Sequence, residues 1–235
     1  SNGDKILDFT SGIGVLALGH NHKKIIDVER KFQDLNIIDT QKFGPNKLQA
    51  ALAYNLSQLL PEDLEVSFFA VSGAESVEAA IKLSTMAKGN KAKYFISATE
   101  GYHGKTLGAL SLTDTENFSE GFHVGLPKEN TIKIDYNNIQ SYKDKILELS
   151  KEKIIAIIVE PIQGQIVEVA KKNYLKEICE ISNQNNIIVI FDEIKCGLGR
   201  SGNLFSFTRF NLLSSTCSIE PISFPDKAEG ILKSL

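Results

Sequence analysis

Two adjacent acidic residues end a strand-like run in the stretch IIVIFDEIKCGLGRSG, residues 187–202. Ile187 to Phe191 is unbroken apolar sequence, and Asp192 and Glu193 come directly after it. An ionised carboxylate at the end of a buried strand needs a partner, because burial of an unpaired charge is costly. For Asp192 that partner is either a cationic group of a ligand or a protein side chain in a structural salt bridge.

A second group of residues suited to chemistry is Ser72-Gly73-Ala74, which opens a helix-like segment. The first N–H groups of a helix have no intrahelical acceptor and lie at the positive end of the dipole, so they bind anions. Ser72 could also act only as a helix cap. Anion binding here and a carboxylate at Asp192 would suit one ligand with an anionic and a cationic end. Pyridoxal phosphate is such a ligand, since a carboxylate beside its ring nitrogen keeps the pyridinium protonated.

The elements that would carry these residues alternate between apolar strands and helices. Continuous β-branched runs separated by helices are typical of a parallel sheet covered on both faces. Ligands of open parallel sheets bind outside the carboxyl ends of the strands. The predicted fold class is therefore α/β, with a mostly parallel sheet flanked by helices. The predicted strands are 66–71, 93–98, 154–160 and 187–192, and the predicted helices are 23–35, 47–60, 74–87 and 173–184.

Composition argues against several classes of function. Among 235 residues, 26 are Lys or Arg and 29 are Asp or Glu, so the net charge is −3 and no nucleic-acid surface is expected. No apolar stretch approaches the length of a membrane span, and no signal-peptide pattern opens the sequence. Cys179, Cys196 and Cys217 lack metal-ligand spacing and predict reduced thiols. We expect no metal and no membrane, and a cytoplasmic location, or the mitochondrial matrix if a transit peptide precedes residue 1.

Five motifs occur in one order along the chain. They are LDFTSGIGVLALGHNH (7–22), VSGAESVEAAIKLS (71–84), GYHGKTLGALSLT (101–113), IIVEPIQG (157–164) and FDEIKCGLGRSGNLFSF (191–207). In order and spacing they resemble the class III pyridoxal-phosphate aminotransferases, which include ornithine, acetylornithine and 4-aminobutyrate aminotransferases. The resemblance runs from about residue 3 to residue 207. It implies part of the large domain of a fold-type I enzyme, and a homodimer with its sites at the subunit interface.

The resemblance implies how the cofactor would be held. The ring nitrogen of pyridoxal 5'-phosphate would pair with Asp192. Tyr102 would stack on one face of the ring, and Ile194 would press on the other. The cofactor phosphate would bind at the start of the helix, to Ser72, Gly73 and Ala74.

Further residues would surround the ring and the substrate. His103 and Glu160 would lie close to the cofactor, and Glu160 would help to order the network around it. Residues 11–15, including Gly12 and Ile13, would line the substrate entrance, partly from the partner subunit.

Three positions depart from the family pattern. Lys105 stands where many relatives have an arginine that binds the substrate carboxylate through two parallel hydrogen bonds, and lysine lacks that fork. Gln165 replaces a glutamate that masks a second arginine in the family's C-terminal region. Lys195 replaces a glutamine that donates to the ring oxygen of the cofactor. A lysine there could still donate, but it would alter the proton balance of the bound cofactor.

The lysine that binds the cofactor covalently in the family has no plain counterpart. The ungapped position, counted from Phe207, is Pro221, which has no amine. With a short insertion, IEPISFPDKAEG follows the family pattern and Lys227 becomes the candidate, with an exposed loop lysine as the alternative. The expected organisation is a remnant of the N-terminal small-domain segment (1–35), a cofactor-binding large domain (36–207) and a divergent tail (208–235).

Two functions from different classes follow from these observations. The first is transamination from an ω-amino compound or an acylated diamine to a 2-oxo acid. The second is a truncated, inactive aminotransferase-like chain that binds the cofactor weakly or only associates with a partner subunit. The departures at 105, 165 and 195 and the aberrant tail favour the second.

Overall fold

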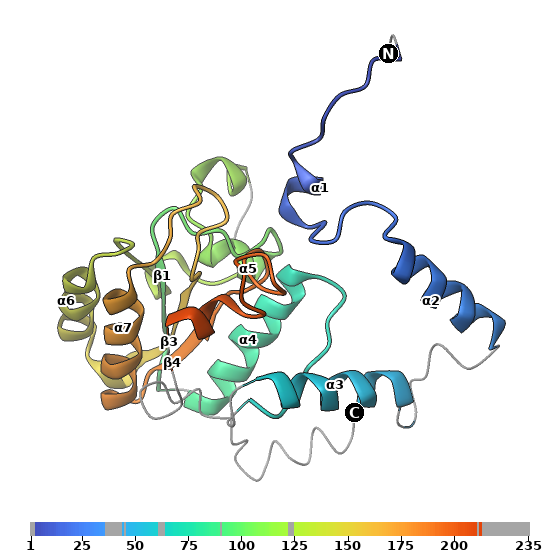
Figure 1. The fold of residues 1–235 in the computed structure, drawn as a ribbon. Coiled ribbons are helices and arrows are strands. Elements are labelled where there is room, and N and C mark those ends of the chain that lie inside the picture. The colour runs from blue at the N-terminus through green and yellow to red at the C-terminus, as the bar shows by residue number, and fades with distance from the viewer. Residues whose placement is uncertain are drawn as a thin grey trace.

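A four-stranded parallel sheet forms the centre of the computed structural model, which describes residues 3–35, 44, 46–60, 64–89, 91–121, 125–210 and 212. The strands lie in the order β2-β1-β3-β4, and each neighbouring pair is parallel. This confirms the predicted parallel α/β arrangement (Figure 1). The strands are β1 (Tyr94–Ala98), β2 (Thr131–Ile134), β3 (Ile154–Val159) and β4 (Ile188–Phe191).

Helices cover both faces of the sheet. The helices on one face are α4 (Gly73–Lys88) and α5 (Leu107–Leu112), and those on the other are α6 (Ile139–Leu149) and α7 (Lys172–Gln184). Strand β3 is buried along its whole length, because it lies between two strands and between both helix layers. Its Ile157 packs with the α6–α7 layer, and its Ile158 packs with the α4–α5 layer.

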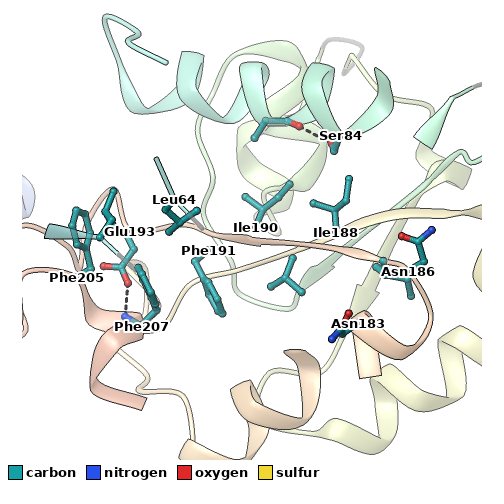
Figure 2. A pocket seen from close by; sticks show the side chains of 14 residues that line it. Leu64, Ser84, Asn183, Asn186, Ile188, Ile190, Phe191, Glu193, Phe205 and Phe207 are labelled. Carbon is teal, nitrogen blue, oxygen red and sulfur yellow. Dashed lines mark hydrogen bonds between the residues drawn. The ribbon is translucent and has the colours of Figure 1, made fainter. Parts of the chain in front are cut away.

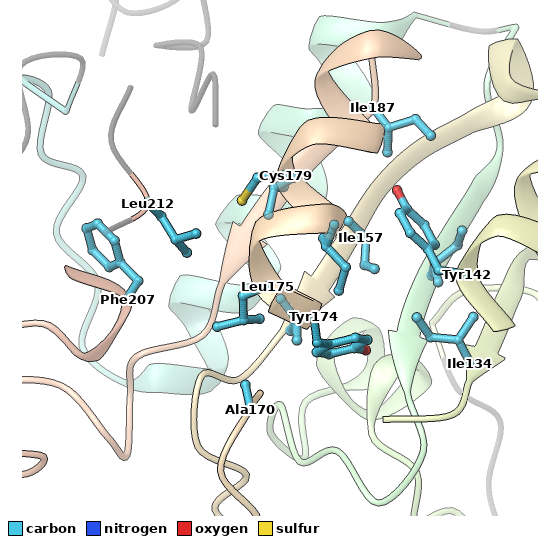
Figure 3. Packing of buried hydrophobic residues seen from close by; sticks show 14 of the residues in the cluster. Ile134, Tyr142, Ile157, Ala170, Tyr174, Leu175, Cys179, Ile187, Phe207 and Leu212 are labelled. Carbon is cyan, nitrogen blue, oxygen red and sulfur yellow. The ribbon is translucent and has the colours of Figure 1, made fainter. Parts of the chain in front are cut away.

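The larger core cluster lies between the sheet and α7 (Figure 3). Leu175 and Ile178 of α7 are fully buried against it. Tyr142 of α6 is also fully buried, and its hydroxyl lies 2.7 Å from that of Ser182 on α7, so the polar group is satisfied. This apolar burial holds the strand ends in place for the site described below.

The prediction of a strand at 66–71 is wrong. The segment has no regular secondary structure, and Val66, Phe68 and Val71 are 82%, 63% and 92% exposed. A strand is stable only when its N–H and C=O groups pair with a neighbour. None of the strands in the described parts of the chain pairs with this segment. Its β-branched and aromatic residues alone were therefore not sufficient to form a strand.

One strand and three helices were not predicted: β2, α6 and the short helices α1 (Ser11–Gly14) and α5. Strand β2 has only four residues and includes Lys133, so its apolar pattern is weak. Helix α6 carried a readable signal, since Ile139, Tyr142, Ile146 and Leu149 have helical spacing. The other predicted helices and strands form within two residues of their predicted ends.

The N-terminal arm, residues 3–35, extends away from the sheet (Figure 1). It contains α1 (Ser11–Gly14) and α2 (Lys23–Asp34), and α3 (Lys47–Leu59) follows it. None of these three helices has a buried residue. No helix in the described ranges is long and apolar enough to cross a membrane. The short 3-10 helices are η1 (Glu116–Phe118), η2 (Lys128–Asn130), η3 (Lys151–Lys153) and η4 (Ser206–Phe210).

A mostly apolar cavity of about 610 Å³ lies beside β4 (Figure 2). Ile188, Ile190 and Phe191 of β4 form one wall, and Ser84 of α4 lies on another. The cavity is bordered by Glu193 but not by Asp192. It is therefore separate from the polar cluster at the strand ends.

Candidate active site

Polar side chains gather where β1, β3 and β4 end. Strand β2 pairs with one edge of β1, and β3 pairs with the other edge. The strand order therefore reverses between β1 and β3. Ligands of open α/β sheets bind at such a switch point, outside the carboxyl ends of the strands. Tyr102 and His103 lie in the loop after β1, Glu160 directly follows β3, and Asp192 directly follows β4.

The carboxylate of Asp192 has two hydrogen-bond partners in the buried centre of this cluster. Its Oδ2 lies 2.8 Å from Nδ1 of His103, and its Oδ1 accepts a hydrogen bond from the N–H of Ile194 at 3.0 Å. The side chains of His103 and Asp192 are only 1% and 4% exposed. The backbone N–H of His103 donates to Oγ1 of Thr113 at 2.9 Å, which fixes the loop. Nε2 of His103 is buried and has no hydrogen-bond partner among the described residues.

Glu160 joins the loop after β1 to the loop after β3. Its carboxylate accepts from the N–H of Tyr102 at 3.0 Å and from the N–H of Gly164 at 2.8 Å. The residue is 4% exposed, and this burial raises the pKa of Glu160, while His103 and the two N–H groups oppose the rise. Glu160 therefore orders two of the three strand-end loops.

Helix α4 begins with a side-chain cap that resembles a capping box but reaches back to Val71, one residue before the N-cap. The Oγ of Ser72 accepts from the N–H of Glu75 at 3.2 Å, and the Glu75 carboxylate accepts from the N–H of Val71 at 3.0 Å. Ser72 thus caps its helix, as the simpler sequence interpretation predicted. Ser72 is also exposed at the helix N-terminus, where the helix dipole favours an anion.

Close contacts bring the start of α4 against the loops that carry Asp192 and His103. A Cβ on Gly73 would lie 2.7 Å from Cγ2 of Ile194, and a Cβ on Gly104 would lie 2.7 Å from Cβ of Ala74. Gly104 also has φ +127°, a conformation that favours glycine. The two predicted ends of the ligand site, the helix N-terminus and the carboxylate, are therefore neighbours.

Lys195 connects this cluster to the N-terminal arm. Its Nζ donates to the carbonyl of Gly164 at 2.7 Å, and its Cε lies 3.0 Å from the Cβ position of Gly14. Gly12 and Ile13 lie beside Gly14 in α1, are exposed, and have φ values of 63° and 62°. The structure thus places Gly14 of the segment 11–15 next to Lys195, beside the strand-end cluster.

The remaining predicted site residues lie at the edge of the strand-end cluster or outside the residues that the structure describes. The Lys105 ammonium lies 3.9 Å from the ring centroid of Phe118, and Tyr102 meets the same ring edge-on at 5.9 Å between centroids. Gln165 is exposed on the turn after Gly164. Lys227 and residues 213–235 lie outside the described residues. Phe118 was not predicted, because no local pattern indicates a ring that contacts two distant side chains.

The two adjacent acids have different roles. The Glu193 carboxylate accepts from the N–H groups of Ser206 and Phe207 at 2.8 and 2.7 Å, so it caps η4 (Figure 2). Cys196 is buried beside it, as predicted for a small core residue, and burial raises its pKa to about 11. No group of three or more His, Cys, Asp or Glu in the described ranges is placed to hold a metal ion.

Comparison with known proteins identifies the family. A family model described as aminotransferase class-III matches residues 1–214. The chain belongs to the class-III aminotransferase family. The acetylornithine aminotransferase of Methanocaldococcus jannaschii is 35% identical over 216 residues, which cover 90% of this chain and 52% of that protein. The putrescine aminotransferase of Pectobacterium atrosepticum is 34% identical over 217 residues, covering 90% of this chain and 46% of that protein.

A solved structure confirms the fold type of this class-III aminotransferase chain. The (S)-enantioselective omega-transaminase of Thermomicrobium roseum superposes with a TM-score of 0.79 at 27% identity, over 88% of this chain and 50% of that one. The parallel sheet and its flanking helices are part of the large domain of fold-type I enzymes. The chain spans about half the length of the curated relatives it matches. Nothing in the family match favours the alternative of an inactive chain.

Class-III aminotransferases depend on pyridoxal 5'-phosphate, and the residues present fit this group. The helix N-terminus at Ser72 suits a phosphate. Position 73 must be glycine for Ile194 to keep its place, because a Cβ there would clash with the Ile194 side chain. The Asp192 carboxylate suits a protonated ring nitrogen, and His103 holds it in place.

Proposed function

We propose that this chain is the cofactor-binding part of an aminotransferase that moves an amino group from an ω-amino compound or an acylated diamine to a 2-oxo acid. The observation that carries the proposal is the pairing of Asp192 with His103 directly beside the N-terminus of α4. The substrate class is supported by relatives that are named acetylornithine and putrescine aminotransferases.

When bound, pyridoxal phosphate supplies an electron sink for the carbon that exchanges its amino group. Asp192 would keep the ring nitrogen protonated, since an ionised carboxylate stabilises the adjacent positive charge. His103 and the N–H of Ile194 hold the Asp192 carboxylate in one orientation. Glu160 would keep the loops of Tyr102 and Gly164 in place around the ring.

We assign the contacts with the cofactor as follows. Tyr102 would cover one ring face and the exposed side chain of Ile194 the other, and Lys195 would lie beside the ring. His103 and Glu160 would lie next to the ring system. The phosphate would bind to the first residues of α4, Ser72, Gly73 and Ala74.

The substrate would enter beside α1 and η1. Gly12 and Ile13 would line the entrance, and Gln165 would lie opposite on its exposed turn. The Lys105 ammonium would bind a substrate carboxylate after leaving the face of the Phe118 ring. The lysine that moves the proton during transfer is assigned to Lys227, outside the described residues.

We also infer a homodimer. The exposed apolar side chains of the N-terminal arm include Ile6, Leu7 and Phe9, which are 88%, 78% and 87% exposed. Contiguous apolar side chains of this kind mark interaction surfaces. Neither α1 nor α2 of the arm has a buried residue, although the arm reaches Lys195. A partner subunit that covers the arm would bury the side chains of these two helices.

Buried thiols such as Cys196 are consistent with a reducing compartment such as the cytoplasm.

The proposal is tested by equilibrium dialysis of the full chain against pyridoxal phosphate. The variant Asp192→Asn should bind about tenfold to a hundredfold more weakly, because hydrogen bonds to charged groups contribute ~1.5–3 kcal/mol. The matched control is Asp144→Asn, which makes the same chemical change on the exposed face of α6 and should bind as the wild type does. Equal binding by both variants would remove Asp192 from the site.

Turnover is tested separately, with acetylornithine or putrescine as donor and 2-oxoglutarate as acceptor. Formation of glutamate by the wild type, and its loss in Asp192→Asn, would support the complete proposal. Cofactor binding without glutamate formation from either donor would contradict the proposed substrate class.

A further inference from the structure

We propose that Lys195 is an amine through which this chain can hold pyridoxal phosphate covalently. The inference rests on the proposed function, since it takes the strand-end cluster to be the cofactor site. It assigns to Lys195 a bond to the cofactor aldehyde, in addition to any contact with the ring.

The position of Lys195 is determined by two glycines. Its Cδ lies 2.6 Å from the Cβ position of Gly164, and its Cε lies 3.0 Å from that of Gly14. The side chain therefore runs through space that only residues without a Cβ leave open. It comes from the loop that begins at Asp192, and its Nζ ends 2.7 Å from the carbonyl of Gly164.

The surroundings of the Lys195 amine belong to the candidate site. Gly164 donates its N–H to Glu160, whose second oxygen accepts from Tyr102. The Cβ position of Gly164 is also 3.2 Å from Oε1 of Glu160, so this carboxylate and the Lys195 stem border the same space. Lys195 is half-buried rather than enclosed, and one hydrogen bond to a carbonyl holds its amine.

Two other lysines are engaged elsewhere. Lys105 is exposed and lies over the Phe118 ring at the rim. Lys133 is directed to Ser97 and to the carbonyl of Leu112, below the end of α5. Lys195 thus brings an amine to the point where the helix N-terminus and Asp192 would orient the ligand.

The bond forms by condensation, without oxidation or reduction. The Lys195 ammonium first loses a proton to water, and the neutral amine adds to the aldehyde carbon of pyridoxal phosphate. The aldehyde oxygen then leaves as water, and a carbon–nitrogen double bond to Nζ remains. Water reverses the step, whereas borohydride reduces the double bond and makes the attachment permanent.

The experiment uses the full chain and pyridoxal phosphate as the probe. One half of each sample is dialysed to measure reversible binding, and the other half is treated with borohydride and mapped by peptide mass spectrometry. We expect labelling of Lys195 about tenfold above that of exposed lysines such as Lys172, the factor that ~1.4 kcal/mol of local binding supplies. Pyridoxal without the phosphate should not show this preference, because it lacks the group that α4 would hold.

Three variants separate Lys195 from its competitors. Lys195→Gln should lose the label while dialysis still detects bound cofactor, and Lys195→Arg should do the same although it keeps the positive charge. Lys227→Gln should keep the label on Lys195.

Two results would overturn the inference. If the wild type binds the cofactor but Lys195 is labelled no more than exposed lysines, Lys195 is not the attachment point and the proposed function stands. If dialysis detects no cofactor on the wild type, the proposed function fails, and the inference fails with it.

Discussion

Two histidine–aspartate pairs in this chain have opposite environments. His103 and Asp192 lie 2.8 Å apart at the strand ends with side chains 1% and 4% exposed. His20 and Asp8 in the N-terminal arm lie 3.8 Å apart with side chains 70% and 48% exposed. The same two residue types therefore form a fixed, desolvated pair in one region and a loose surface contact in the other. Burial, rather than residue type, therefore decides which pair can orient a ligand.

The largest difference is expected when the histidine of each pair is removed. His103→Ala should lower the free energy of unfolding by about 3–5 kcal/mol, because it leaves a buried carboxylate without its main partner. His20→Ala should leave it unchanged within error, because water already screens that pair. Urea unfolding followed by circular dichroism measures both.

A conservative variant keeps this test informative if His103→Ala does not fold. His103→Asn retains an N–H donor near the position of Nδ1 and should recover part of the lost stability. Equal stability losses at positions 103 and 20 would show that the buried pair has no special role.

Apolar residues extend the comparison to the core and the arm. Ile158→Ala should cost about 2–5 kcal/mol, since Ile158 is fully buried in β3 and its truncation leaves a cavity. Ile6→Ala should change the free energy of unfolding by less than about 0.5 kcal/mol in a dilute sample, because Ile6 is 88% exposed. If the arm packs on a second subunit, the effect of Ile6→Ala should grow with protein concentration. An effect that is large at every concentration would contradict the exposed arm.

Lysines provide a smaller, pH-dependent contrast. Burial lowers the pKa of Lys133 from 10.5 to about 8, partly opposed by Asp114. Below about pH 8 both folded and unfolded states carry the proton, and the cost of burying the charge is fully present. Between about pH 8 and 10.5 only the unfolded state keeps it, so Lys133 should add up to about 3 kcal/mol of stability as pH rises.

Urea titrations across this pH range isolate the contribution of Lys133. Lys133→Met should remove the rise, whereas Lys23→Met, in the exposed helix α2, should retain it. A rise of the same size in Lys133→Met would assign the pH dependence to other groups.

Much of the sheet was predictable because its signal is local. The runs that became β3 and β4 are continuous and apolar, and that of β1 is interrupted only by Ser97, as is typical of strands in a covered parallel sheet. The segment 66–71 has a similar composition but pairs with none of the described strands, and this could not be read from its own residues. Strand β2 was not predicted because its sequence is short and mixed in polarity. It forms a strand because it pairs with β1.

The site residues divide in the same way. Placing acids after β3 and β4 follows from the sequence, because the end of each apolar run is visible. Which acid serves which purpose does not follow. Asp192 and Glu193 are neighbours, yet one bonds to His103 and the other caps η4, since successive side chains at a strand end point in different directions.

By itself, the sequence determined the parallel α/β class, the family and the acids that follow β3 and β4, because these depend on local runs and spacing. Tertiary structure decided the partners. It paired His103 with Asp192 across 89 residues, set Phe118 between Lys105 and Tyr102, and ran the Lys195 stem past Gly14 and Gly164. Contacts between segments distant in sequence depend on how the layers pack, and no local pattern encodes them.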